Sequence, residues 1–154
     1  MGNLSFSHMA ISCKDAIATE KFYTKYFGFQ RARVVQLGEQ QIVFIKLGEM
    51  YLELFQANGE SLAPPTDNDG PQYPSWRHLA FQVDDVDAKL AEMDDAKITL
   101  GPLSFDDFIP GWRSVWVADP NDNIVEISQG YIDQDNPPPM DADLARPTTQ
   151  PVVP

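Results

Sequence analysis

The sequence predicts an α+β fold made of two tandem copies of one β-α-β-β-β module. Two observations predict it: short motifs recur along the chain, and each recurrence is followed by the same order of expected strands and helix. A length of 154 residues suits one compact domain, or two small repeats that share a core. With 43% hydrophobic and 22% charged residues, the composition is that of a folded globular protein.

The first repeated motif is His-apolar-Ala-apolar with an Asp four residues further on, and it occurs at residues 8–15 and 78–85. The second motif is apolar-apolar-Glu-apolar-x-Gln, and it occurs at residues 51–56 and 124–129. The first pair is offset by 70 positions and the second by 73. A small loop insertion explains the difference, so the chain is interpreted as one module in two copies.

The first copy begins with a strand expected at residues 4–13. Asp15 is a good N-cap for the helix that follows, and an apolar stripe from Ala18 to Phe27 has helical spacing. Gly28 stands where a helix end favours a left-handed residue. Three strands are then expected at residues 30–36, 41–47 and 50–56, joined by Gly-Glu turns.

The second copy repeats this order from a strand expected at residues 76–83. Asp85 is the expected helix cap. Residues 119–123, Asp-Pro-Asn-Asp-Asn, predict a turn before the last strand. The remaining strands are expected at residues 98–103, 113–118 and 123–129.

The predicted organisation has four parts. Residues 1–57 form the first module, and residues 76–130 form the second. A proline-containing linker at residues 58–75 connects them. A proline-rich, acidic tail at residues 131–154 lacks apolar periodicity and is expected to be extended or flexible.

Charge and cysteine content exclude several classes of partner. The net charge of −12 argues against binding to nucleic acid or to anionic membrane surfaces, because both need an excess of Lys and Arg. No apolar run has the ~20 residues that a membrane span needs. The N-terminus lacks the features of a signal peptide, and Cys13 has no second cysteine to pair with. We therefore expect a cytoplasmic protein.

The chemistry-bearing residues are two histidines and two glutamates, one of each per module. His8 and His78 are the only histidines, and they occupy equivalent positions on the less apolar face of their strands. Glu53 and Glu126 interrupt apolar strands, where an unpaired carboxylate would be costly. A lone strand His or Glu is usually structural, but four in register predict a site for Zn, Ni, Co, Mn or Fe(II).

Other candidates are weaker. Cys13 is expected on the helix-packed face as a small core residue. Five aromatic residues could wall a pocket or simply fill the core: Phe105, Phe108, Trp112, Trp116 and Tyr131. Four arginines are candidate anion-binding groups, with a solvated surface position as the alternative: Arg31, Arg33, Arg77 and Arg113.

These motifs make the sequence resemble the vicinal oxygen chelate superfamily, also called the glyoxalase/bleomycin-resistance/dioxygenase fold. The resemblance covers residues 4–130 and lies in segments 8–15, 22–29, 78–85 and 119–126. It implies that the two modules build a curved, open eight-stranded mixed sheet with the helices on its convex side. It places a metal in the concavity, formed either by two modules of one chain or across a dimer, and we expect a homodimer.

The resemblance also implies roles for individual residues. His8, Glu53, His78 and Glu126 match metal-ligand positions. Glu126 is expected to remove a substrate proton and Glu53 to share that role, as in a glyoxalase-like lyase or isomerase acting on a small molecule with vicinal oxygens. The alternatives are a ring-cleaving dioxygenase, which typically uses two His and one Glu, and a non-catalytic protein that binds a drug or other aromatic ligand. The glutathione-binding residues of the family are not found.

Overall fold

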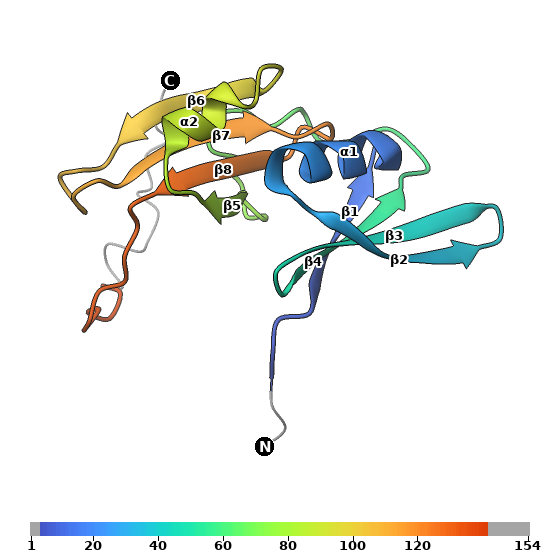
Figure 1. The fold of residues 1–154 in the computed structure, drawn as a ribbon, viewed down its shortest axis with the longest axis horizontal. Coiled ribbons are helices and arrows are strands. Elements are labelled where there is room, and N and C mark those ends of the chain that lie inside the picture. The colour runs from blue at the N-terminus through green and yellow to red at the C-terminus, as the bar shows by residue number, and fades with distance from the viewer. Residues whose placement is uncertain (1–3, 142–154) are drawn as a thin grey trace.

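The computed structural model describes residues 4–141, and its elements follow the predicted order twice (Figure 1). The first module contains β1 (His8–Cys13), α1 (Ala16–Phe27), β2 (Gln30–Leu37), β3 (Gln40–Leu47) and β4 (Met50–Gln56). The second contains β5 (Leu79–Gln82), α2 (Val86–Ala91), β6 (Lys97–Ser104), β7 (Arg113–Ala118) and β8 (Ile124–Gln129).

The eight strands form two four-stranded mixed sheets with the same topology. Their orders are β1-β4-β3-β2 and β5-β8-β7-β6. In each sheet the first and last strands of the module pair in parallel, and the other neighbours are antiparallel. The prediction of an α+β fold with two tandem β-α-β-β-β modules is confirmed. Strand pairing in the described chain stays within each module.

The predicted caps hold helix α1 at both ends. The Asp15 side chain accepts hydrogen bonds from the backbone N–H groups of Ile17 and Ala18, at 2.9 and 3.0 Å. Gly28 ends the helix with a φ of 76°, and its N–H donates to the Thr24 carbonyl. In the second module Asp85 caps the shorter helix α2 through the N–H of Ala88.

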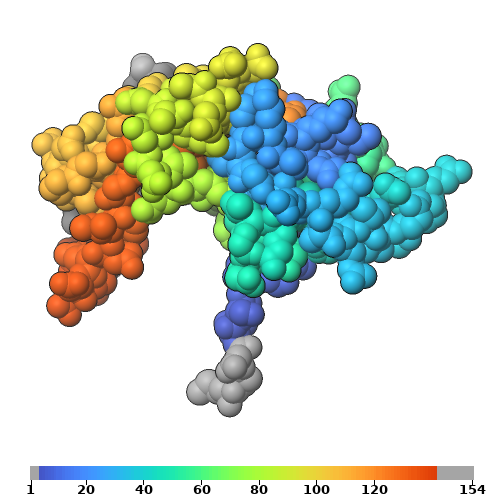
Figure 2. Space-filling model, in the orientation of Figure 1, coloured from blue at the N-terminus to red at the C-terminus, as the bar shows by residue number. Residues whose placement is uncertain are grey.

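One apolar core joins the two modules. Cys13 is fully buried in it, and the other residues of its strand face, Met9 and Ile11, pack against it. In the second module the corresponding face contributes Phe81, whose ring stacks on Phe27 of α1 at 4.5 Å. Helix α1 packs on β1 and β4, and α2 packs on β7 and β8 (Figure 1). Strand alternation places His8 on the opposite face from the core residues Met9, Ile11 and Cys13. Figure 2 shows the two modules side by side, with residues 131–141 extending away from the second.

Two strands are shorter than predicted. The expected strand at residues 76–83 is reduced to Leu79–Gln82, and the one at residues 4–13 to His8–Cys13. In the second module, side chains just before the strand contact Asp69 in the linker. The Arg77 guanidinium binds its carboxylate and the His78 ring binds its carbonyl, while the other ring nitrogen of His78 faces Glu126 on β8. His78 lies just before β5.

The rest of the chain has little regular structure. Residues 131–141 contain neither helix nor strand, and Tyr131 packs against Trp112 with ring centroids 5.9 Å apart. The part of the predicted tail after residue 141 lies outside the described residues. Within the described chain, neither helix has the length and apolarity needed to cross a bilayer.

Candidate metal centre

Parallel pairing of β1 with β4 brings the first His–Glu pair together. Ala10 is the register partner of Glu53, and His8 lies two residues before Ala10, on the same face of the sheet. The imidazole Nε2 of His8 is 3.2 Å from Oε2 of Glu53. The two side chains are 41% and 16% exposed, so this pair opens to solvent on the concave side.

The second module builds the same pair from equivalent positions. Ala80 is the register partner of Glu126, and His78 precedes Ala80 by two residues. Nε2 of His78 is 2.8 Å from Oε2 of Glu126, with the side chains 22% and 12% exposed. The sequence repeat is therefore also a repeat of side-chain geometry.

The chemistry of the second pair fits a metal ion. Nδ1 of His78 is 2.6 Å from the carbonyl oxygen of Asp69. A carbonyl can only accept, so Nδ1 donates in this contact and Nε2 is the ring nitrogen that faces Glu126. A carboxylate can only accept, so either a proton on Nε2 or a cation must lie between the two atoms. Imidazole and carboxylate donors suit first-row divalent ions.

The four predicted ligands do not come together in one chain. Among residues 4–141, no group of three or more His, Cys, Asp or Glu side chains is placed to hold a metal ion. The structure joins His8 to Glu53 and His78 to Glu126, but it does not join the two pairs. Each module thus holds two of the four predicted ligands.

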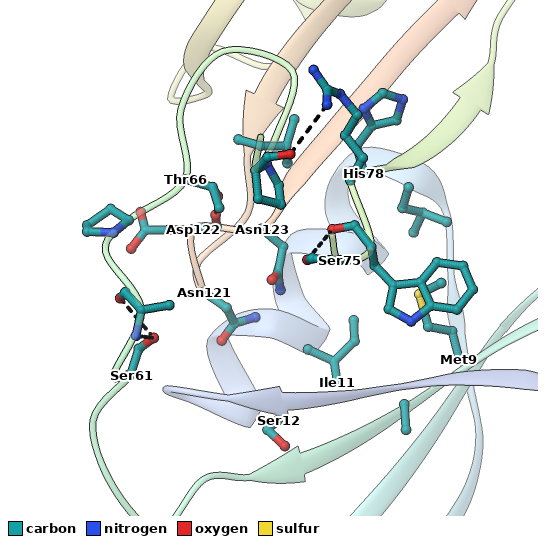
Figure 3. Close-up of a pocket in the computed structure, with 18 of the residues that line it drawn as sticks. Met9, Ile11, Ser12, Ser61, Thr66, Ser75, His78, Asn121, Asp122 and Asn123 are labelled. Atoms are coloured by element: carbon teal, nitrogen blue, oxygen red, sulfur yellow. Dashed lines mark hydrogen bonds between the residues drawn. The ribbon is translucent and has the colours of Figure 1, made fainter. Parts of the chain in front are cut away.

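A cavity of about 570 Å³ lies between the modules (Figure 3). Figure 3 shows side chains of β1, of residues 61–66 and of the turn at 121–123 around it. Both His8 and His78 contribute to its lining. Its aromatic lining residues are Phe6, Tyr23, Tyr73 and Trp76, of which Trp76 is 86% exposed.

The aromatic wall suggested by sequence is not part of this cavity. Trp112 contacts Phe105 at 4.8 Å, and Trp116 lies edge-on to the His78 ring at 6.3 Å. Trp116 is 6% exposed, whereas Phe108 is exposed. Phe105, Trp112 and Trp116 pack together beside His78, and the second His–Glu pair is less exposed than the first.

Three of the four candidate arginines are used in ion pairs. Arg31 binds Glu20 and Arg113 binds Asp87. Two guanidinium nitrogens of Arg77 each lie 2.9 Å from a carboxylate oxygen of Asp69. These hydrogen bonds lower the pKa of Asp69. Arg33 has no ion pair among residues 4–141. It lines a shallow hollow beside His8, and so remains a candidate anion-binding group.

Two residues that support the site were missed by sequence reasoning. Ser114 donates to Oε1 of Glu126 at 2.7 Å, and the Asp69 carbonyl orients His78. The sequence gives a weak indication of the role of Ser114, since it is a polar residue in a largely apolar, buried strand. It gives none for Asp69, because that residue acts through its backbone from within the linker.

Comparisons with known proteins agree with this architecture. Residues 5–127 match the family model of the Glyoxalase/Bleomycin resistance protein/Dioxygenase superfamily. The uncharacterized protein YwkD of Bacillus subtilis (strain 168) is 29% identical over 126 residues, which cover 80% of this chain and 94% of that protein.

Solved structures of two related proteins show the same fold. The glyoxalase family protein from Enterococcus faecalis is 27% identical with a TM-score of 0.63, covering 80% of this chain and 96% of that one. The fosfomycin resistance protein FosX from Listeria monocytogenes, complexed with Mn(II) and sulfate, is 16% identical with a TM-score of 0.59. That match covers 83% of this chain and 93% of FosX, and at this identity it is evidence of fold alone.

Proposed function

Because the chain belongs to the Glyoxalase/Bleomycin resistance protein/Dioxygenase superfamily, we propose that it is a divalent-metal-dependent enzyme of glyoxalase-like type. The reaction is a lyase or isomerase step by proton transfer on a small substrate with vicinal oxygens. One observation carries this proposal: each module holds an imidazole and a carboxylate in contact at equivalent positions of its concave face. The free cysteine is compatible with the cytoplasm as its location.

The complete site is proposed to form between two copies of the chain. Each copy contributes His8 and Glu53 to one site and His78 and Glu126 to the other. Two facts support this homodimer: the pairs stay apart within the described chain, and β2 of the open first sheet is exposed along nearly its whole length. A two-fold dimer would place the open sheet of one copy against the second module of its partner.

The four residues then divide the chemistry. A bound divalent ion would polarise two neighbouring substrate oxygens as a Lewis acid. His8 and His78 would hold the ion through ring nitrogens. Glu126 accepts the proton from the substrate carbon and returns it to the neighbouring carbon, while Glu53 is the second carboxylate and shares this role. The close His–carboxylate contacts hold the acceptor oxygens at defined positions, which proton transfer requires.

Arg33 suggests one property of the substrate. It lines a hollow together with His8, Phe44 and Tyr51, and it has no ion pair among the described residues. A substrate with a negatively charged group would be bound there while its oxygens face the metal. Replacing Arg33 by Met should then raise KM for an anionic substrate and leave KM for a neutral analogue unchanged.

The identity of the metal follows from a direct test. Purified protein is supplied with Zn, Ni, Co, Mn or Fe(II), dialysed, and analysed by mass spectrometry for bound metal. Mn(II) belongs in this set on chemical grounds, and the FosX relative was crystallised with it. Stoichiometric metal in the wild type, lost in His8→Ala and Glu126→Ala, supports the proposal. A wild type that stays empty with all five ions contradicts it.

Complementation tests whether two copies share the site. The double variants His8→Ala/Glu53→Gln and His78→Ala/Glu126→Gln are co-expressed with different tags, and the mixed dimer is purified. If sites form between copies, the mixed dimer keeps one intact site of two and binds about half the wild-type metal. If each chain builds its own site, every site in the mixed dimer is damaged and no metal is recovered.

Oxygen dependence separates the proposed reaction from ring cleavage. Proton transfer consumes no O₂, so the proposed activity persists under anaerobic conditions and needs Glu53. A ring-cleaving dioxygenase would lose activity without O₂ and tolerate Glu53→Gln, since two His and one carboxylate suffice for Fe(II). A ligand-binding protein would bind its aromatic ligand equally well with and without metal.

A further inference from the structure

A chain of hydrogen bonds crosses strands β7 and β8 and ends on Glu126. Oγ of Ser114 is 2.7 Å from Oε1 of Glu126 and 2.9 Å from Oγ of Ser128. Nε1 of Trp112 is 3.1 Å from the same Ser128 oxygen. Ser114 and Ser128 are register partners on the two strands, so the backbone pairing itself sets this contact.

The protons available to these four side chains allow only one donor-to-acceptor direction along the hydrogen bonds. The indole N–H can only donate and the carboxylate can only accept. Ser114 has one hydroxyl proton, and the Glu126 carboxylate takes it. Ser128 therefore donates to Ser114 and accepts from Trp112. The sequence of donors is Trp112, Ser128, Ser114 and then Glu126, and bonds aligned in this way strengthen one another.

Burial makes this arrangement rigid. Ser114 is 0% exposed and Ser128 is 7% exposed, so water cannot readily replace either partner. Breaking a link would leave a buried hydroxyl or carboxylate oxygen without its hydrogen bond, which is costly. With Oε1 held by Ser114, the other oxygen, Oε2, stays directed at Nε2 of His78.

The first module lacks a hydrogen-bond donor to its carboxylate at the position equivalent to Ser114. Trp116 is the register partner of Glu126, and Phe44 is the register partner of Glu53. Ser114 therefore corresponds to Ile42, which has no hydroxyl group. Among the described residues, Glu53 makes its one polar side-chain contact with His8.

We propose that Ser114 is a positioning residue for the metal centre: its hydroxyl fixes the Glu126 carboxylate so that the second module presents a preformed half-site. This inference rests on the proposed function. The Asp69 carbonyl fixes His78 in the same half-site. The second module therefore binds the metal more strongly, and the first module, whose carboxylate is unsupported, completes the coordination.

The test measures metal affinity in the full chain. Ser114→Ala removes the hydroxyl with little change in volume, and Ser128→Ala removes the next link while leaving the Ser114–Glu126 bond in place. Affinity is determined by competition with a chromophoric chelator, using whichever of the five ions the wild type retains. Removing a partner that orients a metal ligand typically costs roughly 10–100-fold in affinity, and this loss is expected for Ser114→Ala. Ser128→Ala should lose less.

A spectroscopic signature distinguishes positioning from general damage. The Co(II)-loaded protein should show an altered visible spectrum in Ser114→Ala and a nearly unchanged one in Ser128→Ala. If Ser114→Ala fails to fold, Ser114→Cys fills the space with a weaker donor, and an intermediate affinity is expected.

Three outcomes would overturn the inference. If Ser114→Ala keeps wild-type affinity and spectrum while His78→Ala loses the metal, Ser114 does not position Glu126, and the proposed function stands. Equal losses in Ser114→Ala and Ser128→Ala, with matching losses of thermal stability, indicate a structural role only. A wild type that takes up none of the five ions overturns the proposed function and this inference together.

Discussion

The two modules carry the same His–carboxylate pair in different surroundings. His78 and Glu126 are 22% and 12% exposed, whereas His8 and Glu53 are 41% and 16% exposed. A backbone carbonyl and a buried hydroxyl hold the second pair. Among residues 4–141, the hydrogen-bond partner of the first pair is Ser7, the chain neighbour of His8, whose Oγ is 2.9 Å from Nδ1. A repeat can therefore conserve ligand type and register while its two copies differ in rigidity.

Segments outside the repeated strands add to this difference. The linker returns to the second module, where Asn68 accepts a hydrogen bond from Thr99 and Gly70 approaches Arg77 so closely that a Cβ would lie 2.0 Å from its carbonyl oxygen. The aromatic residues after β6 cover the inner face of the second sheet. The second pair is therefore enclosed by the linker and by the segment that connects β6 to β7.

The largest expected effect comes from removing one histidine at a time. Removing a residue that orients a metal ligand typically lowers metal affinity roughly 10–100-fold. His78→Ala and His8→Ala each remove a ligand itself, so both should lower the affinity by more than that. The loss should be greater for His78→Ala, since its half-site is preformed. Competition titration of the two variants side by side measures this. Equal losses would mean that the halves contribute equally, and a greater loss for His8→Ala would reverse the comparison.

A smaller effect, on the stability of the fold, is expected from a hydrogen bond between the two modules. The Tyr23 hydroxyl of α1 donates to Asp119 of the second module at 3.1 Å. Burial and the nearby Asp119 charge raise the pKa of Tyr23, so it stays a donor throughout the physiological range. Tyr23→Phe should lower the free energy of unfolding by about 1–2 kcal/mol, because Asp119 keeps its bonds to the turn. Urea denaturation measures the free energy of unfolding. An unchanged midpoint would show that the stability of the protein does not depend on this hydrogen bond.

The ion pair between Lys14 and Asp122 also joins the modules and should give a pH-dependent effect. Hydrogen bonding to Lys14 lowers the pKa of Asp122 below its ordinary 3.8. The pair therefore stabilises the fold above about pH 4, and this contribution is lost as pH falls through the folded pKa. Asp122→Asn should cost up to about 1 kcal/mol at pH 7.

Asparagine is a suitable replacement because Asp122 has a φ of 62°, which Asn also tolerates. The stability gap between wild type and Asp122→Asn should narrow as the pH falls below 3.8, the ordinary pKa of the group. Denaturation curves at pH 7, 5 and 3 follow this. A gap that is constant with pH would assign the effect to backbone or packing and not to charge.

The smallest effect is expected at the far end of the hydrogen-bond chain. Trp112→Phe removes the N–H that donates to Ser128 and keeps a ring against Phe105. Because Ser114 still donates to Glu126, metal affinity should fall by no more than roughly threefold. Chelator competition, run in parallel on Trp112→Phe and Ser114→Ala, measures the metal affinity of each variant relative to wild type. A loss as large as that of Ser114→Ala would show that the chain acts as one unit.

Much of the fold could be predicted because it depends on local patterns. Asp15 and Gly28 mark the ends of α1 through their own side-chain and backbone preferences. The contacts of residues 77 and 78 with Asp69, just before β5, could not be predicted, because they depend on how the linker folds back onto the second module. Ser114 likewise looks like any small polar strand residue until β7 is paired with β8.

The sequence by itself determined the repeat, the identity of the four candidate ligands and the face of the sheet on which they lie, since strand alternation places every second residue together. Only the tertiary structure decided which of these residues meet. Parallel pairing of the first and last strands of each module joins His8 to Glu53 and His78 to Glu126. The packing of the modules keeps the two pairs apart in the described chain, because that packing depends on how the helices and the linker share one core.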